Sequence, residues 1–166
     1  LCDRSVTFMA KPSFRDVGSS CHIHASLWSL DGGTALFADE SDPYGMSATM
    51  RHFIAGQVRT AREFSLLWAP TVNSYKRFQP ESWAPTGVGW GIDNRTLGFR
   101  KVGHGAGTRI EKRIPDAIAL WRDSEIAREC FGDKVHHWVL RSAESEWEAF
   151  NKSVTDWEMY RYFERI

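Results

Sequence analysis

The chain has 166 residues, with 21 Lys plus Arg against 21 Asp plus Glu, so its formal net charge at pH 7 is zero. This balance argues against broad electrostatic binding to nucleic acid or anionic membranes, and no segment approaches the roughly 18 unbroken apolar residues of a membrane span. The cysteines, Cys2, Cys21 and Cys130, are odd in number and lack metal-site spacing, which favours a reducing cytoplasm. We therefore expect a cytoplasmic protein with no nucleic-acid partner and no membrane partner.

The first half of the chain alternates extended and helical patterns. Residues 6–11 and 21–30 predict two strands, and antiparallel pairing is their simplest arrangement. Residues 43–64 predict a long helix, because apolar side chains recur there at spacings of three and four. Residues 69–91 are dense in Pro, Gly and aromatic side chains and predict an ordered, irregular loop over a site.

The second half begins with strands and continues with helices. Residues 92–102 and 108–114 predict strands. The glycine cluster between them is no P-loop, because it lacks the Lys-Ser/Thr pair and leads into a strand. Helices are predicted for residues 118–131, 134–154 and 157–166. His136 and His137 would diverge by about 100° on such a helix, so we expect surface histidines rather than a metal pair.

Two short runs place ligand-type side chains at strand spacing. Residues i and i+2 of a strand face the same side, so His22 projects with His24, and Arg109 projects with Glu111 and Arg113. Imidazole nitrogens and a carboxylate can bind a divalent cation, whereas guanidiniums offer planar forks for phosphate or carboxylate oxygens. If the two faces converge, they form one pocket suited to a metal-nucleotide complex.

Each run also has a simpler interpretation. A His-x-His pair is common on solvated strands, and Arg-x-Glu-x-Arg is often a surface ion-pair ladder whose exposed pairs contribute about 0 to 1 kcal/mol. Three further arginines, Arg77, Arg95 and Arg100, stand beside loop residues, and none has an acidic residue next to it in the sequence. They favour a functional site over the simpler interpretation.

Four segments in a fixed order then carry a family resemblance: GSSCHIH at 18–24, APTVNSYKR at 69–77, NRTLGFR at 94–100 and RIEKRIPD at 109–116. With these segments the chain resembles the C-terminal catalytic part of the glutamine synthetase superfamily, in particular its γ-glutamylpolyamine and γ-glutamylamine synthetases. The resemblance implies an α+β fold, an antiparallel sheet with packed helices, incomplete in this chain. Residues 1–117 would form the sheet-bearing part and 118–166 the C-terminal helical part of the same domain, with the N-terminal β-grasp domain absent.

The resemblance also implies roles for single residues. His22 and Glu111 would ligate Mg²⁺ or Mn²⁺, and His24 would help to hold ATP, the co-substrate. The ATP phosphates would meet Arg95, Arg100 and Arg109. Glutamate would bind at Gly18, Arg77 and Arg113, and the arginines expected to act in catalysis are Arg95, Arg77 and Arg113. Members of the family also imply a ring-shaped homo-oligomer in which a neighbouring subunit completes each site.

Two positions depart from the family pattern. Trp83 stands where glutamine synthetases carry a flap glutamate that helps to bind and deprotonate ammonium, and Val17 stands where an asparagine contacts glutamate. An indole face suits an amine with a carbon chain better than ammonia, although Trp83 could also pack a loop against the core. We therefore expect an ATP-dependent ligase that forms a γ-glutamyl amide from glutamate and an organic amine or polyamine through a γ-glutamyl phosphate.

Three alternatives stay open. The enzyme could be an ammonia-using glutamine synthetase, or the chain could be a catalytically silent scaffold, although the arginines argue against that. A related ligase fold acting on creatine or a cysteine donor would not share all four segments. The family's upstream acidic metal ligands are missing here, and Ala117 runs straight into Ile118 where the family places several dozen residues. We expect omitted residues at this join rather than a real deletion.

Overall fold

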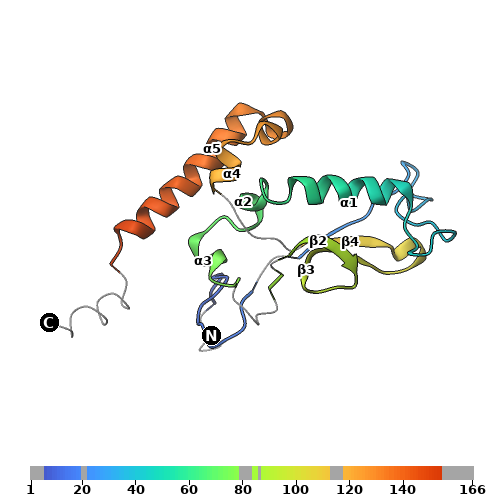
Figure 1. The fold of residues 1–166 in the computed structure, drawn as a ribbon, viewed down its shortest axis with the longest axis horizontal. Coiled ribbons are helices and arrows are strands. Elements are labelled where there is room, and N and C mark those ends of the chain that lie inside the picture. The colour runs from blue at the N-terminus through green and yellow to red at the C-terminus, as the bar shows by residue number, and fades with distance from the viewer. Residues whose placement is uncertain (1–5, 20–21, 79–83, 86, 113–117, 155–166) are drawn as a thin grey trace.

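The structure is a computed structural model that describes residues 6–19, 22–78, 84–85, 87–112 and 118–154 (Figure 1). Its elements, in chain order, are β1 (Ile23–Ala25), α1 (Ala48–Thr60), α2 (Ser65–Trp68), α3 (Val72–Tyr75), β2 (Gly87–Ile92), β3 (Leu97–Val102), a 3-10 turn (Gly105–Gly107), β4 (Arg109–Lys112), α4 (Ile118–Arg122) and α5 (Glu125–Lys152). Among the described residues, no helix is long and apolar enough to cross a membrane.

The strands form one four-stranded sheet in the order β1-β4-β3-β2. The inner strand β4 pairs antiparallel with both β1 and β3, whereas β2 and β3 pair in parallel with a register shift between Gly87 and Trp90. The segment after β2 leads back to the beginning of that strand, so that Leu97, the first residue of β3, lies beside Gly87, the first residue of β2. The two strands therefore run in the same direction. The α+β class is confirmed, and the sheet is mixed rather than wholly antiparallel.

The main core lies between α1 and one face of the sheet. Met50 and Ile54 of α1 are buried with Ile110 of β4 and Phe37 of the preceding loop, and Figure 1 shows α1 running above the strands. Burying side chains of this size contributes roughly 1.5 to 3 kcal/mol each. The predicted helix is confirmed with narrower bounds, because the hydroxyl of Ser47 accepts a hydrogen bond from Met50 N and caps the first turn.

A second core joins α2 to α4 and α5 through Leu66, Trp121, Ala127 and Ala143. The helix predicted for residues 118–131 is interrupted, because the Ser124 hydroxyl accepts a hydrogen bond from Ala127 N and starts α5 there. The expected break before residue 134 is present as a kink at Gly132, whose φ of 75° lies in the left-handed region. The helix predicted for 157–166 lies outside the described residues.

The strand expected at residues 6–11 is wrong, and of the described residues 22–30 only Ile23–Ala25 forms a strand. The backbone of Lys11 instead forms hydrogen bonds with the side chain of Asn73 in α3. Its N–H donates to Asn73 Oδ1 at 2.8 Å, and its carbonyl accepts from Asn73 Nδ2 at 3.0 Å. The expected strand 92–102 is divided by the turn at 93–96, and its first residue belongs to β2. The irregular loop expected at 69–91 contains α3 and most of β2.

His136 contradicts the expectation of a surface histidine, whereas His137 is exposed as expected. The His136 ring stacks on Trp121 at 5.5 Å between centroids. Its Nε2 donates to Trp121 O at 2.7 Å, and Trp121 Nε1 donates in return to His136 O at 3.0 Å. This reciprocal pair locks α4 against α5, because both groups are buried and neither has water as an alternative partner.

We expect His136→Leu to lower the free energy of unfolding by about 0.5 to 1.5 kcal/mol, because it removes a buried hydrogen bond to the Trp121 carbonyl, which keeps the Ser124 amide as a donor at 3.2 Å. His137→Leu is the matched control on the adjacent, exposed position and should change that free energy by less than about 0.5 kcal/mol. Urea denaturation followed by tryptophan fluorescence measures both. Equal effects of the two substitutions would contradict the assignment.

Candidate active site

Two histidines and a buried carboxylate meet on one face of the sheet. His22 Nδ1 lies 2.8 Å from Glu111 Oε1, and His24 Nε2 lies 3.8 Å from Glu111 Oε2. The potential ligand atoms of all three residues lie within 4.8 Å of one another. Glu111 is 1% exposed, whereas both imidazoles remain accessible from solvent. This group, called here the His-Glu cluster, therefore has a buried anion at its base and an open side.

The strand register explains this meeting. His24 of β1 lies directly opposite Glu111 of β4, and cross-strand neighbours on one face have Cβ atoms about 5 Å apart. His22 lies two residues before His24 and therefore shares its side of the chain. Ile110, the residue before Glu111, points the other way into the core under α1. Alternation thus places the polar cluster and the hydrophobic core on opposite faces of one strand.

Arg100 holds the carboxylate of Glu111 from the other neighbouring strand. Its Nε donates to Glu111 Oε2 at 2.7 Å, its second terminal nitrogen contacts the same oxygen, and Nη1 donates to Asp93 Oδ1 at 3.2 Å. Burial by itself would raise the pKa of Glu111. The hydrogen bond and charge of Arg100, with smaller contributions from His22 and His24, outweigh it and hold that pKa below its ordinary value. Glu111 is therefore ionised at neutral pH and available as a ligand.

Arg109 approaches the cluster from the start of β4. Its Nε donates to His24 Nδ1 at 3.3 Å, and its Nη1 donates to Gly107 O at 3.2 Å. A guanidinium can only donate, so this contact makes Nδ1 the acceptor nitrogen of His24. A neutral His24 then carries its proton on Nε2, the nitrogen that faces Glu111. Arg95 lies exposed in the turn between β2 and β3.

The residues present fit a divalent cation. Within the described part of the chain, the buried Glu111 Oε1 accepts no hydrogen bond, although His22 Nδ1 is only 2.8 Å away. Two atoms that ligate one ion at about 2.1 Å lie about 3 Å apart in octahedral geometry, which is close to this separation. An oxygen and an imidazole nitrogen are also donors that Mg²⁺ or Mn²⁺ sites use. His22 and Glu111 would hold the ion, and His24 lies beside these two residues.

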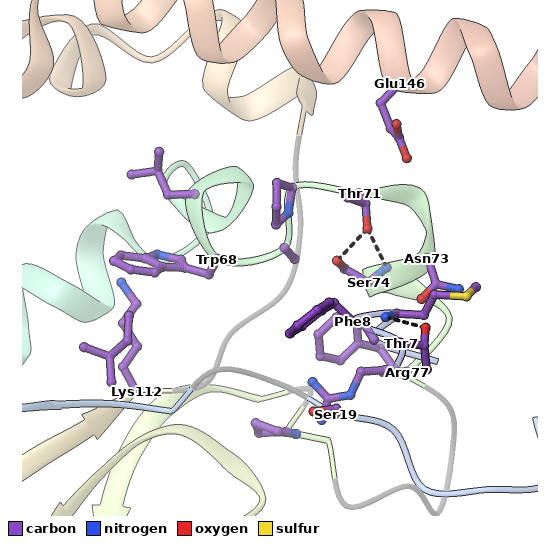
Figure 2. Close-up of a pocket in the computed structure, with 18 residues that line it drawn as sticks. Thr7, Phe8, Ser19, Trp68, Thr71, Asn73, Ser74, Arg77, Lys112 and Glu146 are labelled. Carbon is purple, nitrogen blue, oxygen red and sulfur yellow. Dashed lines mark hydrogen bonds between the residues drawn. The ribbon is translucent and has the colours of Figure 1, made fainter. Parts of the chain in front are cut away.

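A separate cavity of about 980 Å³ lies between the sheet, α2, α3 and α5 (Figure 2). Arg77 and Ser19 line one part of it, Lys112 lies beside Trp68 in another part, and Glu146 points towards it from α5. No residue of the His-Glu cluster lines this cavity. The structure therefore divides the expected site residues into two groups, rather than placing all of them in one pocket.

Gly18 packs tightly against Arg77, and these two residues together with Ser19 are called here the Arg77 group. A Cβ at this position would lie 2.6 Å from Ala10 O and 2.7 Å from Arg77 Nε, closer than real Cβ atoms approach. The amide of Ser19 donates to the same Ala10 carbonyl at 2.8 Å. Only glycine allows this close approach of the backbone to Arg77. Of the other expected site residues, Trp83 and Arg113 lie outside the described residues.

Lys112 was not among the site residues expected from the sequence, although strand alternation after Glu111 already places it on the opposite face. Lys112 is 5% exposed; its Nζ donates to Gln57 Oε1 at 3.1 Å and lies 3.9 Å from the centre of the Trp68 ring and 5.3 Å from that of Phe99. Burial lowers the pKa of Lys112 to about 8, while the ring faces favour the charged form and work against that change. Asp93, the second partner of Arg100, was also missed, and no sequence motif marks it.

Comparison with known proteins finds relatives over most of the chain. Residues 2–120 match the family model described as glutamine synthetase, catalytic domain. The chain is 40% identical over 210 aligned positions to the gamma-glutamylethanolamide synthetase of Streptomyces coelicolor. This alignment covers 98% of this chain and 44% of that protein. The chain is 46% identical over 114 residues to the glutamate–isopropylamine ligase of a Pseudomonas species, covering 68% of this chain and 25% of that protein.

A glutamine synthetase of Rhizobium meliloti is 41% identical over 116 residues, covering 66% of this chain and 26% of that protein. The chain thus spans less than half the length of these relatives. The alignment with the Streptomyces protein is also longer than the 166-residue chain, so that relative carries residues with no counterpart here. We expect the missing stretch between Ala117 and Ile118, and residues 113–117 before this join lie outside the described residues.

The lowered pKa of Lys112 predicts how stability depends on pH. The folded chain releases the Lys112 proton near pH 8, whereas an unperturbed lysine keeps it to 10.5. The unfolded state binds more protons between these values, so the free energy of unfolding rises with pH there. We expect the difference in this free energy between Lys112→Met and the unaltered chain to change by up to about 3 kcal/mol across that window. Urea denaturation at several pH values measures it, and a constant difference would contradict the assignment.

Proposed function

The chain belongs to the glutamine synthetase family, and from this premise we propose that it is the catalytic part of an ATP-dependent ligase that joins glutamate to an amine. The observation that carries the proposal is the His-Glu cluster with Arg100 and Arg109 beside it. ATP phosphorylates the γ-carboxylate of glutamate, the amine attacks the resulting acyl phosphate, and phosphate leaves as the amide forms. A silent scaffold has no need for a buried, ionised carboxylate beside two imidazoles and two guanidiniums.

The chain's own residues serve the first step mainly by position and charge. In phosphoryl transfer, negative charge spreads over the equatorial oxygens, so fixed cationic groups supply most of the catalysis. Arg95, Arg100 and Arg109 would meet the ATP phosphates, and Arg109 also donates a hydrogen bond to His24 Nδ1. A Mg²⁺ or Mn²⁺ ion held by His22 and Glu111 would supply further positive charge at the same oxygens.

Glutamate would bind through Arg77, the backbone at Gly18, and Arg113. Arg77 and Gly18 are in contact in the structure. Gly18 precedes His22 by four residues, so the Cα atoms of these two residues are at most about 14 Å apart. A bound glutamate and a nucleotide phosphate can span that distance together. Arg77 therefore positions the carboxylate, whereas the cluster positions the phosphoryl group.

An organic amine is the nitrogen donor that we favour. Trp83 replaces an anionic flap residue by an indole, and the gamma-glutamylethanolamide synthetase and glutamate–isopropylamine ligase are among the relatives. Glutamine synthetases among the relatives favour ammonia as the alternative. A ring-shaped homo-oligomer, a cytoplasmic location, and the division into 1–117 and 118–166 stay predictions.

Phosphate release from ATP by the purified protein, with glutamate and magnesium, tests the nitrogen donor. We expect turnover with ethanolamine, short alkylamines or polyamines, and at least about tenfold less with ammonium, because no carboxylate at position 83 binds that ion. Trp83→Glu should raise the ammonium rate relative to the amine rate, whereas Trp138→Glu, on the exposed face of α5, should leave the ratio unchanged. Equal or better use of ammonium would restore the ammonia-using alternative, and silence with every donor would favour the scaffold.

Glu111→Gln tests the cation site without relying on turnover. The substitution removes the anionic ligand but keeps its shape, so we expect Mn²⁺ affinity in calorimetry to fall by about tenfold or more. Glu129→Gln, an exposed position on α5, makes the same charge change as a control and should bind Mn²⁺ as the unaltered chain does. Thermal melting checks that both variants fold. Unchanged affinity in Glu111→Gln would exclude this carboxylate as a ligand.

A further inference from the structure

Arg100 lies between two carboxylates that differ sharply in their surroundings. Glu111, on the neighbouring strand, is 1% exposed, whereas Asp93, at the end of β2, is 73% exposed, and Arg100 itself is 13% exposed. The guanidinium uses different nitrogens for the two partners, Nε and Nη2 for Glu111 and Nη1 for Asp93. It can therefore release one carboxylate and still keep an ion pair with the other.

The turn after β2 holds Asp93 in this place. Asp93 has a φ of 46°, and no other described residue except glycine has a positive φ. Its amide donates to Lys101 O at 2.9 Å, which ties the turn to the residue directly after Arg100. A left-handed conformation is uncommon for residues other than glycine and persists where the surrounding structure enforces it. The side chain of Asp93 is thus positioned beside Arg100 by the backbone.

The contacts of Glu111 show why its arginine matters for loading the cluster. Arg100 occupies Oε2, the oxygen that faces His24, while Oε1 beside His22 accepts no hydrogen bond from the described residues. A divalent cation at Oε1 would lie next to the guanidinium in a poorly solvated place, where like charges repel strongly. The cation and Arg100 therefore make opposing demands on the same carboxylate.

We propose that Arg100 is a positioning residue that neutralises Glu111 until a cation binds and then shifts its ion pair to Asp93. Arg100 and the cation thus compete for Glu111. Asp93 favours cation binding because it offers Arg100 an alternative partner. This inference rests on the proposed cation site of the ligase. The shift frees the Nε and Nη2 donors of Arg100, which an anionic ligand such as a phosphate can accept. Cation loading and phosphate binding then favour each other, and the coupling is reciprocal.

Mn²⁺ binding to the full chain without nucleotide, measured by calorimetry, tests the exchange. Arg100→Gln removes the competitor, so we expect Mn²⁺ to bind about fivefold tighter or more. Asp93→Asn removes the alternative partner and should weaken binding by a similar factor. In the double variant the Asp93 substitution should have no further effect, because it acts only through Arg100. Arg62→Gln makes the same charge change at an exposed position just after α1 and should leave the affinity unchanged.

Each other result has a definite meaning. Weaker or unchanged Mn²⁺ binding in Arg100→Gln would overturn the competition between Arg100 and the cation. An effect of Asp93→Asn that persists in the double variant would show that Asp93 acts on the cation independently of Arg100, and would overturn the exchange. Absence of Mn²⁺ binding by the unaltered chain would overturn the cation site and this inference together. Arg100→Lys keeps the charge without the forked donors and should give an intermediate affinity if the chain folds as the unaltered protein does in thermal melting. Ligase turnover does not enter these measurements, so the proposed reaction stands or falls separately.

Discussion

The pairing of Glu111 with residues on both neighbouring strands is the interaction on which the candidate site depends. Glu111 lies opposite His24 on one side and Arg100 on the other. A buried carboxylate is costly unless charged and hydrogen-bonding groups compensate it, and here Arg100 supplies that compensation. A shift of β4 by one residue would turn Glu111 toward the core and Ile110 toward solvent. Register and chemistry are therefore one constraint.

The two faces of the sheet carry different kinds of side chain, because successive residues of a strand point to opposite faces. One face carries the His-Glu cluster, whereas the other packs Ile110 under α1 and places Lys112 against Trp68. The Arg77 group lines a cavity that also contains Lys112, so the two groups of candidate residues are not neighbours within a single pocket. The short segment from Gly18 to His22 connects them.

Local patterns predicted the elements whose stability is local. The apolar spacing found α1, the composition change found the C-terminal helices, and the gap before residue 134 coincides with the kink at Gly132. The predictions are wrong where a contact with a residue distant in the sequence determines the local structure or the burial of a side chain. Lys11 bonds Asn73 instead of a strand, and His136 is buried because Trp121 stacks on it. Sequence spacing contains neither partner, since each lies many residues away.

The sequence by itself determined the family and the chemical types of the site: four ordered segments, the His-x-His and Arg-x-Glu-x-Arg strands, and the arginines between them. Strand alternation also determined which of these side chains share a face, because that period is a property of the backbone. Only the tertiary structure decided that Arg100 pairs with Glu111 and Asp93, that Arg77 faces a separate cavity, and that Lys112 is buried among aromatic rings. Those contacts depend on strand order and register, which are set by packing across the whole domain rather than by neighbouring residues.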